Sequence, residues 1–139
     1  MIQYILDTDI LTLFQNGHPN VVQRARAVSQ SQLAVSVISV EEELTGWYAK
    51  LRRAKKKDQL ARAYRRLTDA VQFFSRLDVL TFTEQAIERY EYLRSTLRRM
   101  SKNDLRIASI VLEHDVVLVT RNIRDFQQVP GLKTEDWSQ

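Results

Sequence analysis

The sequence predicts an α/β protein with a short, mostly parallel sheet of four to five strands flanked by helices. Short apolar segments alternate with longer segments whose apolar residues recur at helical spacing. Several short segments are continuous apolar runs rich in β-branched residues, which is typical of strands covered on both faces. Because parallel neighbours need crossover connections, this alternation favours a parallel sheet wrapped by helices. The 139 residues show no repeat or linker, so we expect one domain over residues 1–139.

The predicted strands come first. An apolar run that begins at Ile2 stops abruptly at Asp7 and Asp9, and it reads as a buried first strand. The second strand is expected over residues 33–38, with Ser39 opening the next helix. The other predicted strands are residues 78–82, residues 116–120 and a short segment at 132–134 that follows the Pro130-Gly131 turn.

The predicted helices are amphipathic. They span residues 9–14, 21–29, 39–51, 55–76, 84–98 and 101–114. The apolar positions of the third helix are assigned to the core; they are Val40, Leu44, Trp47, Tyr48 and Leu51. The stripes over residues 60–74 and 86–97 are more than one small sheet can cover, so we expect packing between helices and a homodimer.

Composition limits the possible functions. The absence of cysteine excludes disulfides, thiolate zinc sites and a cysteine nucleophile. Met1 leads straight into a short strand, and no apolar run approaches the ~20 residues of a membrane span. We therefore expect a cytoplasmic protein without a membrane partner. Lys and Arg outnumber Asp and Glu by 21 to 17, and this modest excess is compatible with a polyanionic partner.

Acidic residues follow the predicted strands. Asp7 and Asp9 follow the first strand, three glutamates at 41–43 follow the second, and Asp125 follows the fourth. Asp104 lies on a helix in line with inward-facing apolar residues. Because the carboxyl ends of parallel strands share one edge, we expect these carboxylates to converge there.

Helix capping is the competing explanation for the same residues. Asp7, Thr8 or Asp9 could cap the first helix, and the spacings Ser39-x-x-Glu42 and Ser101-x-x-Asp104 fit the capping box or its Asp variant. The first spacing also singles out Glu42 among its neighbours. Three carboxylates arriving from separate elements are hard to explain as caps alone.

A divalent cation would relieve the repulsion between converging carboxylates. We expect one or two Mg²⁺ or Mn²⁺ ions with Asp7, Glu42 and Asp104 as ligands, directly or through water. Such ions generate a nucleophile from water and stabilise phosphoryl charge, as phosphodiester hydrolysis needs. The supporting residues assigned to orienting ligands or contacting substrate are Thr8, Ser39, Asn103 and Thr120.

Four segments together resemble the PIN-domain ribonucleases, and among them the VapC-type toxins of VapBC toxin–antitoxin pairs. The segments are Leu6-Asp7-Thr8-Asp9, Ser36-Val37-Ile38-Ser39-x-x-Glu42-x-x-x-Gly46, Asn103-Asp104-x-x-Ile107-Ala108 and Val119-Thr120-Arg121-Asn122-Ile123-Arg124-Asp125-Phe126. The resemblance implies a PIN-like domain that hydrolyses RNA, including tRNA, with Asp7, Glu42 and Asp104 as its acidic residues. It also implies a VapB-type antitoxin that blocks the site.

The sequence departs from this family at two positions. Asp9 stands where Asn is more common, and Asn122 stands where Asp is frequent. If residues 122–126 form one helical turn, Asp125 reaches the region that Asn122 borders, so we predict Asp125 as the fourth catalytic acid. Asp9 is the alternative.

Basic residues are candidates for binding RNA phosphates, and solvated helix faces are the competing explanation. The candidates are Lys55, Lys56, Lys57, Arg121 and Arg124.

Two other functions stay open. One is a non-catalytic module that binds RNA or docks a partner. The other is an aspartyl phosphotransferase using Asp7 and Asp9, although the glycine expected after the second Asp is Ile10.

Overall fold

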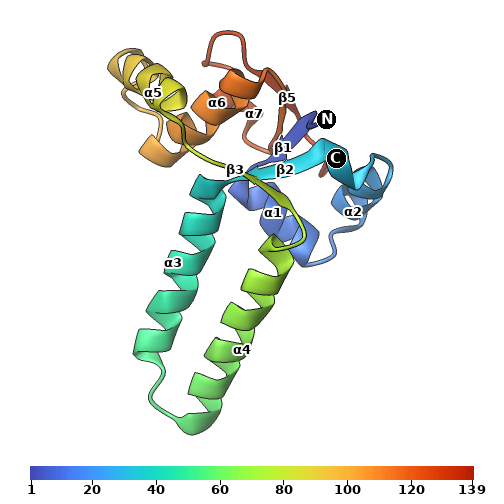
Figure 1. The fold of residues 1–139 in the computed structure, drawn as a ribbon, viewed down its shortest axis with the longest axis vertical. Helices are drawn as coiled ribbons and strands as arrows, with labels where there is room; N and C mark the ends of the chain where they lie inside the picture. Colours follow the sequence, from blue (N-terminus) through green and yellow to red (C-terminus); the bar gives the residue numbers. More distant parts are fainter.

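The computed structural model describes all 139 residues as a five-stranded sheet covered by helices (Figure 1). The strands are β1 (Tyr4–Leu6), β2 (Leu33–Ser36), β3 (Asp78–Leu80), β4 (Val117–Val119) and β5 (Lys133–Glu135). The helices are α1 (Thr8–Gln15), α2 (Pro19–Arg26), α3 (Val37–Arg53), α4 (Lys57–Phe74), α5 (Glu84–Thr96), α6 (Lys102–His114) and α7 (Ile123–Phe126), and a 3₁₀ turn spans Gln30–Gln32.

The sheet has the order β3-β2-β1-β4-β5, and every pair of neighbours is parallel. Leu6 of β1 is in register with Val35 of β2 and with Val119 of β4. The residues that follow these positions therefore lie level at one edge. The predicted α/β class is confirmed, and the sheet is wholly rather than mostly parallel.

Alternate residues of the central strands enter two separate cores. Ile5, Ala34 and Leu118 belong to a cluster with α5 and α6. Leu6 and Val119 belong to a second cluster that includes residues of α1, α2 and the end of α4. Since side chains alternate along a strand, both faces of the sheet are buried, as the continuous apolar runs predicted.

The helices α3 and α4 form a long hairpin that extends away from the sheet (Figure 1). Its seam includes small residues of α4, since Ala63 and Ala70 are buried, whereas Phe74 at the end of α4 belongs to the second core. The predicted stripes are partly wrong. Tyr48 on α3 and the α4 residues Leu60, Tyr64 and Val71 are exposed, because the hairpin projects beyond the cores that would cover them.

The boundary between β2 and α3 also differs from the prediction. The strand ends at Ser36, whose side chain accepts a hydrogen bond from the Ser39 N–H at 3.2 Å and caps α3. Ser39 lies inside the helix rather than at its cap, and Glu42 lies in the second turn. By contrast, Ser101 caps α6 by accepting from the Asp104 N–H, as its spacing predicted. None of the helices combines the length and apolar character needed to cross a membrane.

Candidate active site

The candidate site lies at the point in the sheet where the chain stops adding strands on one side of β1 and begins adding them on the other. The chain runs from β1 through β2 to β3 on one side and from β4 to β5 on the other, so β1 and β4 flank the point at which open α/β sheets bind ligands. Asp7 follows β1 and Thr120 follows β4. A pocket of about 440 Å³ opens here. Its lining residues are Asp7, Thr8, Asp9, Glu42, Asp104, Ile107, Arg121, Asn122 and Phe126.

Asp7 is both a helix cap and a buried acid. Its carboxylate accepts a hydrogen bond from the Ile10 N–H at 2.8 Å, so one of the two explanations proposed for it, capping of α1, is correct. Only 6% of the residue is exposed. Burial raises the pKa of Asp7 to about 6, although the Thr120 hydroxyl and the Ile10 N–H oppose the rise. The nearby charges of Asp9 and Asp104 add to it.

Asp104 enters the pocket from the third position of α6. Burial raises its pKa above the ordinary Asp value, against the lowering effect of Ser101. The charges of Glu42 and Asp125 raise this pKa further. Asp7 and Asp104 therefore hold their negative charges at an energetic cost, which a nearby cation would reduce.

A hydrogen-bond network holds Glu42. The Thr8 hydroxyl donates to one carboxylate oxygen of Glu42 at 2.6 Å, and the Asn103 amide donates to the other at 3.1 Å. The buried Ser39 lies 2.8 Å from the Thr8 oxygen, and Arg106 donates to the Asn103 side-chain oxygen at 2.8 Å. Sequence reasoning missed Arg106. Its signal was the helical i,i+3 spacing from Asn103.

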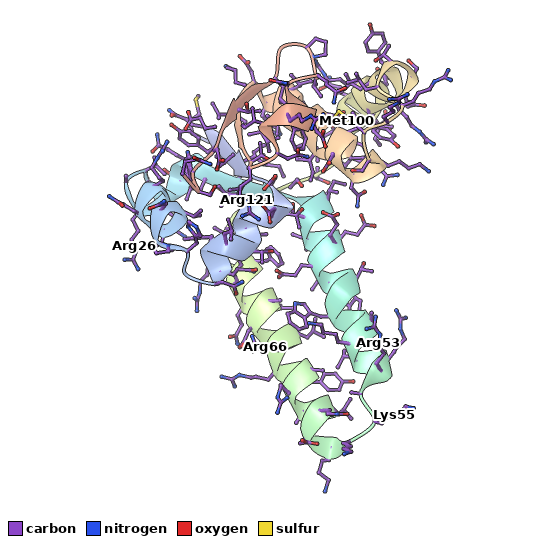
Figure 2. All side chains as sticks on the ribbon, turned by 180° about the vertical axis from the view of Figure 1, so that it is seen from behind. Arg26, Arg53, Lys55, Arg66, Met100 and Arg121 are labelled. Carbon is purple, nitrogen blue, oxygen red and sulfur yellow. The ribbon has the colours of Figure 1, made fainter.

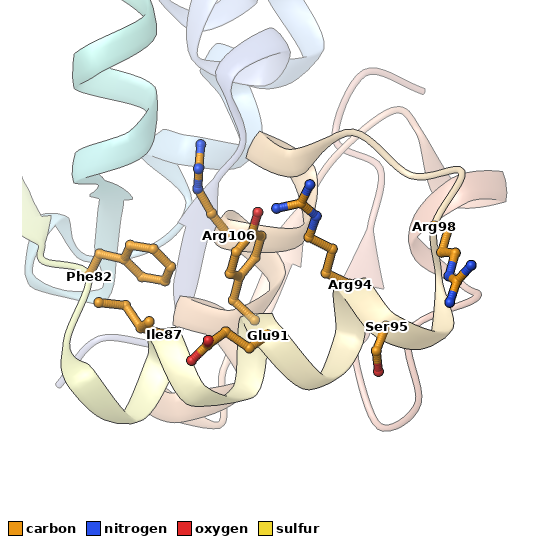
Figure 3. A pocket seen from close by; sticks show the side chains of 8 residues that line it. Phe82, Ile87, Glu91, Arg94, Ser95, Arg98 and Arg106 are labelled. Atoms are coloured by element: carbon orange, nitrogen blue, oxygen red, sulfur yellow. The ribbon is translucent and has the colours of Figure 1, made fainter.

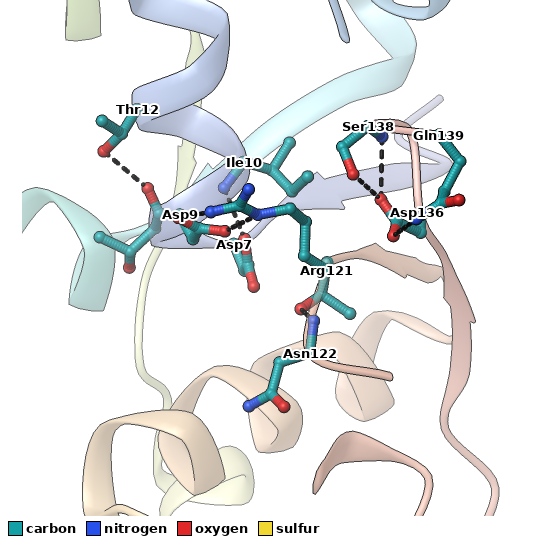
Figure 4. A network of polar contacts seen from close by, with 11 residues as sticks. Asp7, Asp9, Ile10, Thr12, Arg121, Asn122, Asp136, Ser138 and Gln139 are labelled. Carbon is teal, nitrogen blue, oxygen red and sulfur yellow. Dashed lines mark hydrogen bonds and ion pairs between the residues drawn. The ribbon is translucent and has the colours of Figure 1, made fainter. Parts of the chain in front are cut away.

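Two hydrogen-bonded pairs border the pocket, and Figure 4 shows the first of them, Arg121 with Asp9. Arg121 donates two hydrogen bonds to Asp9, at 2.6 and 3.0 Å, and both side chains are about half exposed. The Asn122 amide donates to Asp125 at 3.0 Å. The predicted helical turn exists as α7, but Asn122 rather than Asp125 lines the pocket.

Other candidates for substrate binding lie elsewhere. Residues 55–57 lie at the turn between α3 and α4, and Figure 2 shows Lys55 at the far tip of the hairpin from Arg121. These lysines do not line the pocket with the acidic residues. Arg124 is exposed on α7 and does not line it either.

The donor set fits a hard divalent cation, but the side chains are not gathered into a finished metal centre. Carboxylate oxygens are the ligands that Mg²⁺ and Mn²⁺ prefer. Burial, with a smaller contribution from neighbouring carboxylates, raises the pKa values of Asp7 and Asp104. As the side chains stand, no three His, Cys, Asp or Glu residues lie close enough together to hold an ion. The Glu42 carboxylate instead accepts hydrogen bonds from Thr8 and Asn103.

A PIN domain profile matches residues 4–132, and the chain belongs to the PIN domain family. The family expected from the four motifs is thereby confirmed. Among known proteins, the chain is similar to the tRNA(fMet)-specific endonuclease VapC of Shigella flexneri, with 29% identity over 99% of this chain and 100% of that protein. It is 30% identical to the ribonuclease VapC1 of Haemophilus influenzae strain R2866, over 97% of this chain and 98% of the relative.

The fold is similar to a chain in the crystal structure of DNA-bound VapBC from Salmonella typhimurium. The TM-score is 0.79, the sequences are 27% identical, and the match covers 99% of both chains. The protein is therefore similar in sequence and in fold to VapC ribonucleases along nearly its whole length.

Proposed function

We propose that this protein is an endoribonuclease that acts as the toxin of a type II toxin–antitoxin pair. One observation carries the proposal: Asp7, Glu42 and Asp104 arrive from three separate elements and line one pocket at the switch point of a parallel sheet. The similarity to proteins named as ribonucleases supports RNA as the substrate. Since the Shigella flexneri relative is named as specific for tRNA(fMet), tRNA is the first substrate to test.

Asp7 and Asp104 would hold a divalent cation, Mg²⁺ or Mn²⁺, with Glu42 as a third ligand. When bound, such a cation activates water and neutralises charge on the phosphoryl oxygens. Glu42 lines the same pocket as Asp7 and Asp104, and binding a cation would compete with the hydrogen bonds that it accepts from Thr8 and Asn103. Asp125 is the fourth acidic group. It does not line the pocket itself, but it accepts a hydrogen bond from Asn122, which does, and its charge raises the pKa of Asp104.

The remaining pocket residues position these groups and the RNA. Ser39 fixes the Thr8 hydroxyl, which in turn orients Glu42, and Thr120 favours the ionised form of Asp7. Arg121 lines the pocket with half of its side chain exposed, so it can contact an RNA phosphate when Asp9 releases it. The exposed Lys55, Lys56, Lys57 and Arg124 attract RNA over a longer range.

Cleavage of purified tRNA tests this function. We expect cleavage with Mg²⁺ or Mn²⁺, loss of cleavage in excess EDTA, and at least a hundredfold slower rates for Asp7→Asn and Asp104→Asn, about the loss expected when a metal ligand is removed. Asp58→Asn is the matched control, since Asp58 lies in the first turn of α4 on the hairpin, outside the pocket. Undiminished cleavage in EDTA would contradict the proposal. RNA binding without any cleavage would instead favour the non-catalytic module.

We also propose a VapB-type antitoxin as the partner, because the similar Salmonella typhimurium structure is a VapBC complex. An antitoxin segment that enters the acidic pocket would block RNA. Co-expression with the product of a neighbouring gene should restore growth and yield a complex that elutes as one species. Failure of every neighbouring gene product to suppress toxicity would contradict this pairing.

The phosphotransferase alternative is not supported by the site. The residue after the second Asp is the fully buried Ile10 rather than the expected glycine, and the similar proteins are named as ribonucleases. Asp7 itself is held against the Ile10 N–H as a helix cap.

A further inference from the structure

A second pocket, of about 790 Å³, lies outside the acidic site, between α5 and the start of α6. Its lining residues are Phe82, Ile87, Tyr90, Glu91, Arg94, Ser95, Arg98 and Arg106 (Figure 3). Three arginines and one glutamate make this pocket basic. In Figure 3 the Arg94 and Arg106 side chains extend toward the same end of the pocket, and Glu91 points the other way, toward Ile87. Arg98 lies at the far end of the pocket and points away from Arg94 and Arg106.

The arginines of this pocket have no acidic partner. The ion pairs of the protein involve Arg24, Arg65, Arg121, Lys133 and His114, and none involves Arg94, Arg98 or Arg106. Arg94 lies on α5 and Arg98 follows the end of that helix, so both add to the lining of the pocket positive charge that no ion pair balances. An anion bound there would balance this charge.

Tyr90 provides an independent sign of a missing ligand. The residue is only 7% exposed, and its hydroxyl is buried without any hydrogen-bond partner. A buried donor without an acceptor costs about 1–3 kcal/mol. Arg106 lies over the Tyr90 ring, with its guanidinium carbon 5.2 Å from the ring centre. The unpartnered hydroxyl and the arginines therefore belong to the same pocket, and a phosphate oxygen is the acceptor that would satisfy both.

Arg106 also connects this pocket to the acidic site. It donates to Asn103, and Asn103 donates to Glu42. A group bound by Arg106 would thus be connected through Arg106 and Asn103 to Glu42, a proposed metal ligand. An RNA strand carries a phosphate at every nucleotide, so a strand cleaved at the acidic pocket presents further phosphates nearby.

We propose that the pocket formed by Tyr90, Arg94, Arg98 and Arg106 binds a backbone phosphate of the RNA adjacent to the cleavage site. This inference rests on the proposed ribonuclease function. The guanidinium groups of Arg94 and Arg106 bind the phosphate oxygens, and the Tyr90 hydroxyl donates to one of them. Arg98 adds positive charge at the far end of the pocket. Because Arg106 also holds Asn103, phosphate binding positions the strand relative to Glu42.

RNA binding in EDTA tests the pocket without cleavage. The probe is a fluorescein-labelled single-stranded RNA of mixed sequence, measured by fluorescence anisotropy over a salt series. We expect the Kd of Arg94→Ala and Arg98→Ala to rise about five- to twentyfold, and the slope of log K against log salt to fall by about 0.7 for each lost phosphate contact. Arg89→Ala is the matched control, an exposed arginine on α5 outside the pocket, and its Kd should stay within about twofold.

Tyr90→Phe separates binding from folding. Because the hydroxyl has no partner in the protein, its removal should leave thermal stability unchanged or raised, while the Kd for RNA rises about threefold or more. In the cleavage assay, Arg94→Ala should raise KM and leave kcat close to that of the wild type.

The proposal is overturned if Arg94→Ala and Arg98→Ala bind RNA as Arg89→Ala does. It is equally overturned if they bind RNA normally but lose self-association in sedimentation, because the pocket would then be a contact between copies. A different result would contradict the ribonuclease function itself: cleavage that stays unchanged in EDTA or in the Asp7→Asn variant.

Discussion

Asp7 combines a favourable contact with an unfavourable environment. The Ile10 N–H stabilises its ionised form, yet burial dominates and raises its pKa to about 6 from an ordinary value of 3.8. Since the pKa is higher in the folded protein than in the unfolded chain, Asp7 lowers the stability of the metal-free fold at neutral pH. The loss develops as pH rises from 3.8 to about 6 and is complete above that window.

The first prediction concerns Asp7→Asn. Asn caps a helix as well as Asp does but carries no charge, so the metal-free variant should be more stable than the wild type at pH 7.5, by on the order of 1–3 kcal/mol. The difference should shrink as pH falls through the window and vanish near pH 3.8. Urea unfolding in EDTA measures it. Added Mn²⁺ should stabilise only the wild type, and equal stability of the two proteins in EDTA at pH 7.5 would refute this account.

The second prediction concerns the fourth acidic group. Asp125 raises the pKa of Asp104 and is held by Asn122, whereas Asp9 is bound by Arg121. We expect Asp125→Asn to raise the Mg²⁺ concentration needed for half-maximal cleavage by about tenfold, with a smaller rise for Asn122→Ala. Asp9→Asn should need the same Mg²⁺ concentration as the wild type. The opposite ranking of Asp125→Asn and Asp9→Asn would assign the role to Asp9.

At the level of elements, much of the fold could be predicted from local patterns. Continuous apolar runs marked the buried strands, and Ser101 marked the start of α6. The start of α3 could not be predicted, because Ser36 and Ser39 are chemically equal candidates for a cap. A tertiary contact distinguishes them: the Ser39 hydroxyl is hydrogen-bonded to Thr8 of α1, whereas the Ser36 hydroxyl is free to cap α3. The Glu42 network could not be foreseen for the same reason.

The hairpin of α3 and α4 shows the limit of helical periodicity. The stripe containing Leu60, Tyr64 and Val71 is as apolar as a buried face, and yet it is exposed. Periodicity identifies an apolar face but does not say what covers it. The packed seam instead uses Ala63 and Ala70, whose small size lets the two helices approach closely.

The third prediction tests that seam. Ala70→Leu adds volume where α4 is buried, and we expect it to lower the free energy of unfolding by about 1–3 kcal/mol. Val71→Ala, at the next position but 54% exposed, should change it by less than about 0.5 kcal/mol. Midpoints of urea unfolding at constant m-value compare the two. Equal effects would mean that the helices separate in solution.

For the whole molecule, the exposed stripe on α4 indicates association. Ala86, Tyr90 and Leu93 of α5 are buried within one chain, so the stripe over residues 86–97 does not support the predicted homodimer. The stripe of Leu60, Tyr64 and Val71 remains, and we predict that it joins two copies. Sedimentation at tens of micromolar should show a dimer for the wild type and a monomer for the double variant Leu60→Glu, Tyr64→Glu. A monomeric wild type would contradict the prediction.

The strand order also determines when this protein can become active during its synthesis. β1 is synthesised well before its sheet neighbour β4, and the Arg121–Asp9 pair joins residues 112 positions apart. Asp104 and Asp125 likewise belong to the final third of the chain. A nascent or truncated chain that ends before β4 therefore has neither the central sheet nor the full acidic pocket. Under the proposed function, RNA cleavage can begin only after β4 and the pocket residues that follow it, Arg121, Asn122 and Phe126, have been synthesised.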